Sequence, residues 1–439
     1  MYAFDFFQRL RAGRPAGSPR LRRAAALGGV PAIAWGLGAT SLLTDVSSEA
    51  VASVLPLYLV LELQLDPLQF GVIDGVYNGL ALALLGLVAG GFADRHRAHR
   101  AVAAFGYALS AACKPLLLLT SLGWAWFAWV LAVDRAGKGI RTTPRDALLS
   151  LHSPHAALTT AFAAHRALDA LGAFAGPLLA FAILALLPGS YDVVWLAAFA
   201  FALCGLAVLG LFVPPSPNTG VTTARNDIRP QLLQPALPLL DAGTARLLAL
   251  AFLLACGSVG DGFLYLALRD RTALPGAYMP LYYVFTSLAF AVLALPMGLV
   301  ANRIGRVNVL CAGFVLLWLA YVLLLAGWPD AGGGGGWMQA LVLVLFGAFH
   351  ACTDGVLVAM LAARTQAGVR AMGVALLATA VGLGKFASSL AFGWLARDHG
   401  DALALSCFAA ALPPVVLAAA WLLRRDEVFR GPDVGRPAC

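Results

Sequence analysis

Ionisable side chains stand inside stretches of this sequence that are otherwise almost free of charge. The segment TDVSSE places Asp45 and Glu49 four residues apart, on one face of a helix. Asp261 lies in a later apolar stretch, and His350 and Asp354 lie one helical turn apart in another. A charge at the centre of a membrane helix costs roughly 2.5–3.5 kcal/mol on insertion scales, so it usually faces a partner or a cavity. Carboxylates in such a cavity can take up and release protons.

The same reasoning applies to a larger set of ionisable residues. The candidate proton-coupling or cavity residues are Asp45, Glu49, Asp134, Arg135, Asp261, His350, Asp354 and Lys385. The alternative for each is a buried ion pair that fixes helix packing. We expect packing for Lys114 and for Arg166 with Asp169. We expect a cavity for Asp45 and Asp261, because neither has a cation in its own apolar stretch.

The spacing of other reactive residues gives little support to catalysis or metal binding. The pair His350 and Asp354, like the pair His152 and His155, could supply two metal ligands, but a closed site needs more. No GxSxG nucleophile motif occurs. The Gly-Lys dipeptide at Gly137 lacks the first glycine and the following Ser or Thr of a phosphate-binding loop. We therefore expect no metal, no cofactor and no enzyme activity.

The surroundings of these residues indicate a membrane protein. The chain has 439 residues, of which 61% are hydrophobic and 12% are charged, whereas a soluble domain carries about 25% charged residues. It divides into about twelve apolar stretches of ~20 residues, the length of a membrane-spanning helix. Lipid offers no partner for backbone groups, and continuous apolar runs lack the alternation of a β-barrel, so helices are expected. The expected helix starts are Pro31, Leu68, Val102, Trp124, Leu158, Val193, Leu247, Tyr278, Val307, Gln339, Met372 and Ala402.

The net charge of +8 could indicate nucleic-acid binding, but the positive residues follow a topological pattern. Arginines concentrate in the N-terminal tail and in every second loop, for example at Arg95, Arg97 and Arg100. By the positive-inside rule these segments and both termini lie in the cytoplasm. We therefore expect a lipid bilayer, and no nucleic acid, as the partner of this surface.

A Pro-rich polar segment in the middle of the chain separates two halves. Two motifs of the form Gly-x-x-x-(Asp or Asn)-Arg, from Gly90 to Arg95 and from Gly298 to Arg303, occupy matching places and indicate an internal repeat. The prediction is an all-α polytopic membrane protein with about twelve transmembrane helices in two six-helix bundles. Its predicted domains are a basic tail (1–30), an N-terminal bundle (31–213), a cytoplasmic linker (214–245), a C-terminal bundle (246–425) and a C-terminal tail (426–439).

Two bundles, a cytoplasmic linker and the loop motif Gly-x-x-x-Asp-Arg-x-Gly-Arg together resemble the major facilitator superfamily. The resemblance implies that this loop gates alternating access, with Asp94 and Arg95 as a gating pair. The first copy has Arg97 where the family has Gly, and the second has Asn302 where the family has Asp. The implied gating residues are Gly90, Asp94, Arg95, Arg145, Asp146, Gly298, Asn302, Arg303, Gly305 and Arg306.

Further motifs narrow the resemblance. TDVSSE, together with R-x-G-K-G-I-R-T-x-P-R-D-A-L from Arg135 to Leu148, is similar to a bacterial branch of the superfamily, which implies a bacterial inner-membrane location. The stretch from Gly172 to Gly176 and Pro177 resembles a motif of drug–proton antiporters. Small residues at this spacing also serve plain helix packing, so both interpretations stay open.

The charged segment 134–150 is expected to cover the cytoplasmic end of the fourth helix and the loop after it. Asp134 and Arg135 would face the translocation pathway. Gly137 and Gly139 would loosen the helix end and could act as a hinge.

The basic residues of this segment have two expected roles. Lys138, Arg141 and Arg145 would reach the membrane interface and meet anionic headgroups. Arg145 with Asp146 would also pair with Asp94 and close an inner gate.

Three functions are open at this point. The first is proton-coupled export of small amphiphilic or cationic compounds by alternating access, because acids outnumber bases among the candidate cavity residues. The second is proton-coupled import of a metabolite or siderophore by the same machinery. The third is a non-transporting membrane sensor or assembly partner, against which the absence of a long polar segment argues. For the carriers we expect a monomer whose partners are a small-molecule substrate and protons.

Overall fold

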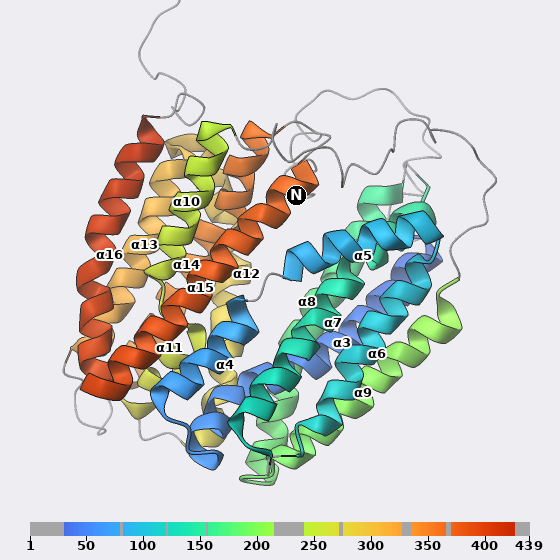
Figure 1. Ribbon diagram of the computed structural model, residues 1–439, viewed down its shortest axis with the longest axis horizontal. Helices are drawn as coiled ribbons and strands as arrows, with labels where there is room; N and C mark the ends of the chain where they lie inside the picture. The colour runs from blue at the N-terminus through green and yellow to red at the C-terminus, as the bar shows by residue number, and fades with distance from the viewer. Residues whose placement is uncertain are drawn as a thin grey trace, which may run out of the picture. The chain divides into compact units, whose positions relative to one another are not determined.

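The computed structural model of the protein describes residues 30–79, 82–119, 122–154, 157–214, 241–271, 275–326, 335–365 and 370–425 (Figure 1). Over these ranges the chain is helical and contains no β-strand. Residues 1–29 of the predicted tail, residues 215–240 of the predicted linker and the predicted C-terminal tail lie outside the described residues.

The helices have the length and the apolar character of membrane spans. Within the described ranges, nine candidate spans occur, from Ala32–Glu62 to Asp401–Arg424. Helices α7 (Trp124–Leu151) and α8 (Leu158–Leu186) begin at the predicted residues. The chain is therefore an all-α polytopic membrane protein, as predicted.

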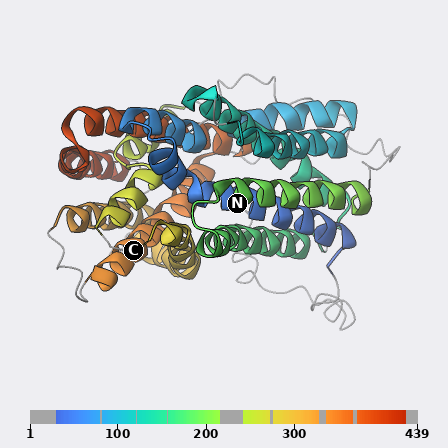
Figure 2. The same ribbon diagram turned by 90° about the horizontal axis from the view of Figure 1, so that it is seen from below.

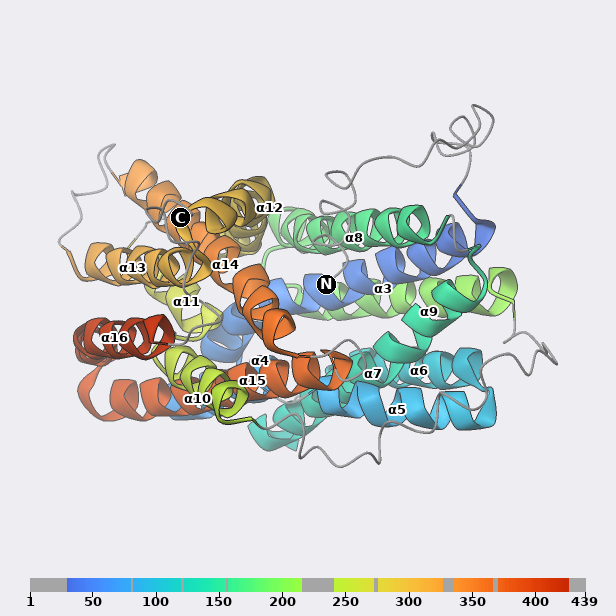
Figure 3. The ribbon, with the colours of Figure 1, turned by 90° about the horizontal axis from the view of Figure 1, so that it is seen from above.

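The first compact unit contains α3 as far as Val54 and the helices α5 to α9. Helix α3 lies between α8 and α9, as Figures 2 and 3 show. Helix α7 packs along both α5 and α6. The bounds of these helices are α3 (Ala32–Leu57), α5 (Leu82–His96), α6 (His99–Leu116), α7 (Trp124–Leu151), α8 (Leu158–Leu186) and α9 (Tyr191–Phe212).

The second compact unit contains residues 55–81 together with the described helices after residue 241. Helix α10 lies along α15, and α14 packs against α12 and α13 (Figure 3). The elements are the π-helical turn η1 (Tyr58–Glu62), α4 (Pro67–Gly79), α10 (Ala242–Cys256), α11 (Asp261–Asp270), the 3-10 turn η6 (Gly276–Tyr278), α12 (Met279–Ile304), α13 (Arg306–Leu325), α14 (Gly335–Arg364), α15 (Arg370–His399) and α16 (Asp401–Arg424).

Helix α4 packs along α15 of the second unit, although α5, the next helix in the chain, belongs to the first unit (Figure 1). Glycines bring the two backbones together, as is common between membrane helices. A Cβ added at Gly71 would lie 2.3 Å from the Ser389 carbonyl oxygen, and one added at Gly79 would lie 2.6 Å from the Gly382 carbonyl oxygen. The second predicted span is thus two helices that belong to different units.

The seventh predicted span is also two helices, α10 and α11, separated by residues 257–260. The break releases backbone groups that need other partners inside a membrane protein. The Tyr321 hydroxyl accepts a hydrogen bond from the Val259 N–H (2.7 Å), and the Ser388 hydroxyl donates to the Ser258 carbonyl (2.5 Å). Side chains of α13 and α15 therefore stabilise the break.

Asp241 lies near the end of the predicted linker and caps α10. Its carboxylate accepts a hydrogen bond from the Thr244 N–H (3.0 Å) and forms an ion pair with Arg364 (3.3 Å). These contacts, the Thr244 hydrogen bond first, hold the pKa of Asp241 below its ordinary value. The start of the second half is thereby attached to the end of α14.

Helix α7 continues as one helix through segment 134–150, so the prediction of a loop there is wrong. Its glycines serve close packing. A Cβ added at Gly137 would lie 2.8 Å from the Gly106 carbonyl oxygen of α6, and one added at Gly106 would lie 2.7 Å from the Gly137 carbonyl oxygen. Because α6 lies this close, Arg141 and Arg145 are buried in the bundle and do not reach the headgroups as predicted.

Arg97 and Gly305 occupy the same position in the two loop motifs, seven residues after Gly90 and Gly298. Both have a positive φ, 51° at Arg97 and 95° at Gly305. The turn of the first motif therefore keeps a glycine-like conformation, although an arginine occupies it. A left-handed conformation costs a residue with a Cβ roughly 1–2 kcal/mol.

Exchanging the residue types at these two turns is expected to shift stability in opposite directions. Arg97→Gly should raise the free energy of unfolding by up to about 1 kcal/mol, because the relieved strain exceeds the extra chain entropy of glycine. Gly305→Ala should lower it by about 1–3 kcal/mol. Thermal unfolding in detergent measures both, and two shifts of the same sign would contradict the prediction.

Candidate functional site

A group of acids surrounds the break between α10 and α11 in the second unit. Asp74 of α4 is buried and accepts hydrogen bonds from the Ser389 hydroxyl (2.6 Å) and the Asn78 amide (3.0 Å). Its carboxylate lies against Gly260, where an added Cβ would fall 2.1 Å from the Asp74 Oδ2. Gly260 is the N-cap of α11, so the carboxylate stands at the positive end of that helix dipole. Asp74 thus joins α4, α11 and α15.

Asp261 and Lys385 complete this group. Asp261 is the first residue of α11, and its side chain is half-buried. Lys385 of α15 interacts electrostatically with Asp261, Asp354 and Asp74. Three of these residues, Asp261, Asp354 and Lys385, were predicted from the sequence. We call Asp74, Asp261, Asp354 and Lys385 the acid cluster.

His350 and Asp354 form the predicted pair on one face of α14. The His350 Nδ1 and Asp354 Oδ2 atoms are 3.7 Å apart, and the Asp354 side chain is 62% exposed. The His350 ring packs between Phe346 and Phe349, with centroid distances of 4.9 and 5.0 Å. In the part of the chain that the structure describes, no three His, Cys, Asp or Glu side chains gather as a metal site would require.

Asp134 forms a buried ion pair in the first unit. Its Oδ1 lies 2.9 Å from the Lys114 Nζ, and both side chains are 1% exposed. Its Oδ2 lies 3.0 Å from Arg135, and the Ser110 hydroxyl donates to the same carboxylate. The prediction that Asp134 and Arg135 face the translocation pathway is therefore wrong here, because α6 supplies Lys114 from within the bundle. Lys114 has the packing role expected for it.

Asp45 has a cationic neighbour that sequence reasoning did not foresee. The Arg141 Nη2 of α7 lies 3.7 Å from the Asp45 Oδ1, and both residues are buried. The Arg141 guanidinium also lies over the Tyr107 ring, 4.5 Å from its centroid. The helix of Asp45 offers no cation beside it, but a different helix supplies the counter-charge. Asp45 therefore does not need a cavity to neutralise its charge.

Arg145 lies in a second buried network of the first unit. Its guanidinium donates to the Ser41 hydroxyl (2.8 Å) and forms ion pairs with Asp146 (3.0 Å) and Asp169 (3.7 Å). Ser41 in turn donates to Asp169 (2.6 Å). The carboxylate of Asp169 also pairs with Arg166 (3.4 Å), as expected from their spacing.

The predicted ion pair between Arg145 and Asp94 is wrong in this conformation. Asp94 pairs instead with His99, at 2.7 Å from its Nε2. Arg95 is exposed. Gly90 allows α5 to approach α7, since an added Cβ would lie 2.6 Å from the Thr143 side chain. In the first loop motif, Gly90 therefore serves the close contact between α5 and α7.

The second loop motif differs from the first in its contacts. Asn302 and Arg303 are exposed, and an added Cβ at Gly298 would meet no atom within 4 Å. Arg306 donates to the Ala359 carbonyl (3.2 Å), which attaches the start of α13 to α14. The two copies of the motif are therefore alike in backbone turn and unlike in packing.

Two further predicted groups lie on or against the helix that carries Asp45. Glu49 is half-buried and lies 3.5 Å from Lys138, which was expected at the headgroups. On α8, an added Cβ at Gly172 would lie 2.4 Å from the Leu42 carbonyl oxygen, and one at Gly176 would lie 2.8 Å from the Val46 carbonyl oxygen. Helix α8 continues through Pro177. The antiporter-like motif is thus the seam between α8 and α3.

Comparison with known proteins identifies the family. The sequence matches the Major Facilitator Superfamily over residues 37–287 and 268–438. The chain belongs to this superfamily. It is 28% identical over 368 residues to an uncharacterized MFS-type transporter of Methanocaldococcus jannaschii, covering 82% of this chain and 87% of the relative. An uncharacterized protein of Mycobacterium bovis is 32% identical over 280 residues, covering 61% of this chain and 65% of the relative.

Solved structures confirm the predicted major facilitator fold. The nucleoside transporter NupG superposes with a TM-score of 0.72 at 15% identity, covering 89% of this chain and 98% of that one. A peptide transporter POT in complex with sulfate gives a TM-score of 0.70 at 16% identity, covering 97% and 99%. At this identity the likeness concerns the fold alone. Fold and family together make the protein a multi-pass secondary transporter of the major facilitator type.

The main residue of this transporter that sequence reasoning missed is Asp74. The signal was present: Gly71, Gly75 and Gly79 are spaced by four residues, a pattern of close helix contact, and Asp74 lies within it. A carboxylate inside a glycine seam must find a partner on the opposing helix, which here is Ser389 of α15.

Proposed function

We propose that this transporter exchanges protons for small cationic or amphiphilic compounds, as an exporter in a bacterial inner membrane with both termini in the cytoplasm. The observation that carries the proposal is the buried Asp74 carboxylate, which lies against Gly260 at the break of α10 and α11, next to Asp261. We expect the substrate and the proton to compete for the acid cluster.

Charge balance supports this exchange. One ammonium group neutralises one carboxylate, so the acid cluster carries excess negative charge when Asp74, Asp261 and Asp354 are all ionised. Like charges in a site of low dielectric constant repel strongly, and a proton or a cationic ligand relieves that repulsion. Because either one suffices, binding of the cation favours release of the proton. This competition is what an antiporter requires.

The local backbone supports a binding role for the same place. Broken helices near a substrate site are a recurring device of secondary transporters, because their ends offer unpaired backbone groups and a helix dipole. Here the break lies between residues 257 and 260, and α11 begins at Asp261. The α11 N-terminus favours negative charge beside it, which stabilises the carboxylates of Asp74 and Asp261.

Aromatic side chains beside the acids suit an amphiphilic substrate. The rings of Tyr265 and Tyr283 are 4.5 Å apart, and Tyr265 lies one helical turn after Asp261 on α11. Tyrosine rings attract cations on their faces and apolar groups by contact. A compound with an apolar body and a positive charge matches both properties of the site.

The test measures proton movement in proteoliposomes that contain the purified transporter and a pH-sensitive dye. We expect a cationic substrate added outside a vesicle to drive protons outward, and we expect Asp261→Asn to abolish this movement. Asp192→Asn is the matched control, because Asp192 is an exposed carboxylate on α9. A panel of lipophilic cations, with neutral metabolites and ferric siderophores for comparison, defines the substrate class.

The sign of the pH change separates the alternatives. Outward proton movement supports exchange, whereas protons entering together with a metabolite or siderophore would indicate the importer. Substrate flux that Asp261→Asn leaves unchanged would refute the role of the acid cluster. A folded protein that moves no compound of the panel would favour the sensor or assembly partner.

A further inference from the structure

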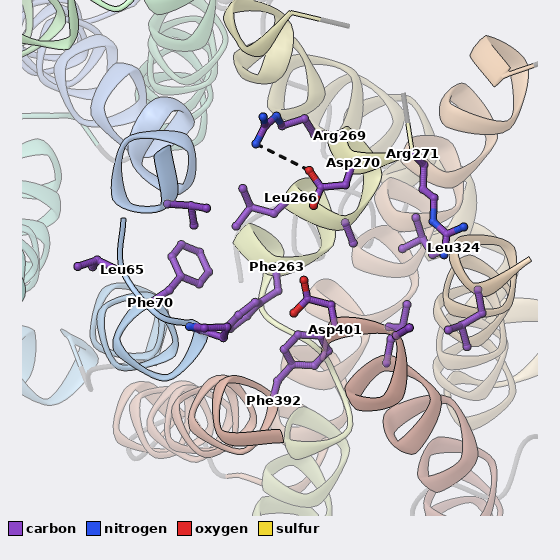
Figure 4. Close-up of a pocket in the computed structure, with 16 residues that line it drawn as sticks. Leu65, Phe70, Phe263, Leu266, Arg269, Asp270, Arg271, Leu324, Phe392 and Asp401 are labelled. Atoms are coloured by element: carbon purple, nitrogen blue, oxygen red, sulfur yellow. Dashed lines mark ion pairs between the residues drawn. The ribbon is translucent and has the colours of Figure 1, made fainter. Parts of the chain in front are cut away.

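A pocket of about 280 Å³ opens in the second unit (Figure 4). It lies beside the acid cluster, since a Cβ added at Gly262 would be 2.8 Å from the Phe70 Cζ of the pocket wall and 3.1 Å from the Asp74 Oδ1. Its walls come from η1, α4, α11, α13, α15 and α16, and its lining contains none of the four residues of the acid cluster. Pockets for small molecules span roughly 300–1,000 Å³, so this one suits a compact ligand.

Three phenylalanine rings from three helices lie in the wall of this pocket. The Phe70 and Phe263 centroids are 4.6 Å apart with the planes at 83°, and the Phe263 and Phe392 centroids are 4.6 Å apart with the planes at 48°. The rings are therefore turned differently. Aromatic faces attract cations, by about 0.5–1 kcal/mol at exposed sites and ~2 kcal/mol where water is excluded.

The charged residues of the pocket leave one carboxylate directed at these rings. Arg269 and Asp270 pair with each other at 3.8 Å. Arg271 is exposed, and in Figure 4 its guanidinium points toward Leu324, away from the labelled phenylalanines. The Asp401 side chain is exposed as well, and its carboxylate points toward Phe263 in the same view. An exposed carboxylate thus stands beside the aromatic wall of the pocket.

We infer that this pocket is a second binding site, one that takes a small organic cation with an apolar body, such as an aromatic quaternary ammonium. Asp401 supplies the counter-charge, and Phe70, Phe263 and Phe392 enclose the apolar and cationic parts of the ligand. The second site takes the same class of ligand as the proposed transport site, and its physiological role rests on the proposed function. Binding at the pocket itself requires no proton exchange.

Two alternative roles for the charged residues of this pocket lead to different expected results. An acidic residue in the first turn of α16 also stabilises the helix dipole, and this role alone would give no preference for cations in the pocket. An anion would instead bind Arg269 or Arg271, which also line the pocket. A probe placed inside the pocket therefore distinguishes three cases by its charge preference. A preference for cations indicates the second site, no preference indicates that Asp401 only stabilises α16, and a preference for anions indicates binding to the arginines.

The test places a single cysteine in the pocket, as Leu266→Cys, in a full-length chain whose seven native cysteines have been replaced. The thiol is modified with three methanethiosulfonate reagents: a trimethylammonioethyl cation, a sulfonatoethyl anion and the neutral methyl compound. Each modification rate is divided by the rate at which the same reagent modifies a small thiol in solution, which removes the intrinsic differences in reactivity. We expect the normalised rate of the cation to exceed that of the anion roughly tenfold, which corresponds to ~1.4 kcal/mol.

Two variants connect this preference to Asp401. Asp401→Asn is expected to remove it, whereas Asp398→Asn keeps it, because Asp398 is an exposed carboxylate three residues away that does not line the pocket. Phenyltrimethylammonium should slow modification, and its neutral isostere tert-butylbenzene should not. Phe263→Leu should weaken this protection and leave the charge preference unchanged.

The outcomes distinguish the second site from the proposed function. Equal rates for the cation and the anion, or equal protection by both phenyl compounds, would overturn the second site. In an Asp261→Asn background, which is expected to lack proton exchange, protection by phenyltrimethylammonium should persist. Loss of protection in that background would mean that the ligand binds at the acid cluster, and would also overturn the second site.

Discussion

Asp134→Asn is expected to destabilise the protein by about 3–5 kcal/mol, the usual cost of removing one partner of a buried ion pair. The Asp134 carboxylate faces Lys114 at 2.9 Å and Arg135 at 3.0 Å, and the Lys114 side chain is 1% exposed. The amide removes the negative charge without changing the shape. The buried Lys114 ammonium then has no counter-charge from α7, so the contact between α6 and α7 weakens.

The reverse change should cost less. In Lys114→Met the Asp134 carboxylate keeps Arg135 and the Ser110 hydroxyl as partners. The double variant, Lys114→Met with Asp134→Asn, should be more stable than Asp134→Asn alone, because it no longer buries an unpaired ammonium.

Thermal unfolding in detergent, followed by the loss of monodisperse protein, measures these three variants together. Asp192→Asn serves as the control, since this exposed carboxylate should change the midpoint little. Equal midpoints for Asp134→Asn and the unchanged protein would show that the pair does not hold the two helices together.

Gly71→Ala is expected to destabilise the second unit by about 1–3 kcal/mol and to remove most of the transport activity. The added Cβ would lie 2.3 Å from the Ser389 carbonyl oxygen, which is part of a helix backbone and cannot rotate away. Helix α4 must therefore shift away from α15. That shift also lengthens the 2.6 Å hydrogen bond between Ser389 and Asp74.

A matched control lies in the same unit. Gly355→Ala adds the same methyl group to the interior of α14, where no atom lies within 4 Å, and should be neutral or stabilising by up to about 1 kcal/mol. Transport assays and thermal unfolding are run on both variants. If Gly71→Ala matches Gly355→Ala in both measurements, the contact between α4 and α15 does not constrain the site.

The candidate site could be predicted in part. Asp261, Asp354 and Lys385 were predicted from their place in apolar stretches, and their role in transport stays a prediction. Asp74, the fourth member, follows from the seam between α4 and α15, which no local pattern specifies. In segment 134–150 the charges were expected to matter, but their partners were predicted wrongly. Arg145 meets Asp169 of α8 and Asp94 meets His99, because helix packing places these side chains next to each other.

The sequence by itself determined that this protein is a helical membrane transporter of the major facilitator type. Long apolar runs must form helices in lipid, since each backbone group needs a partner within its own helix, and the repeated loop motif and polar linker mark two halves. Only the tertiary structure decided which charges meet. The partners Lys114 and Asp134, Asp45 and Arg141, and Asp74 and Ser389 lie on different helices. For Lys114 with Asp134, and for Asp74 with Ser389, glycine contacts set how closely the two helices approach.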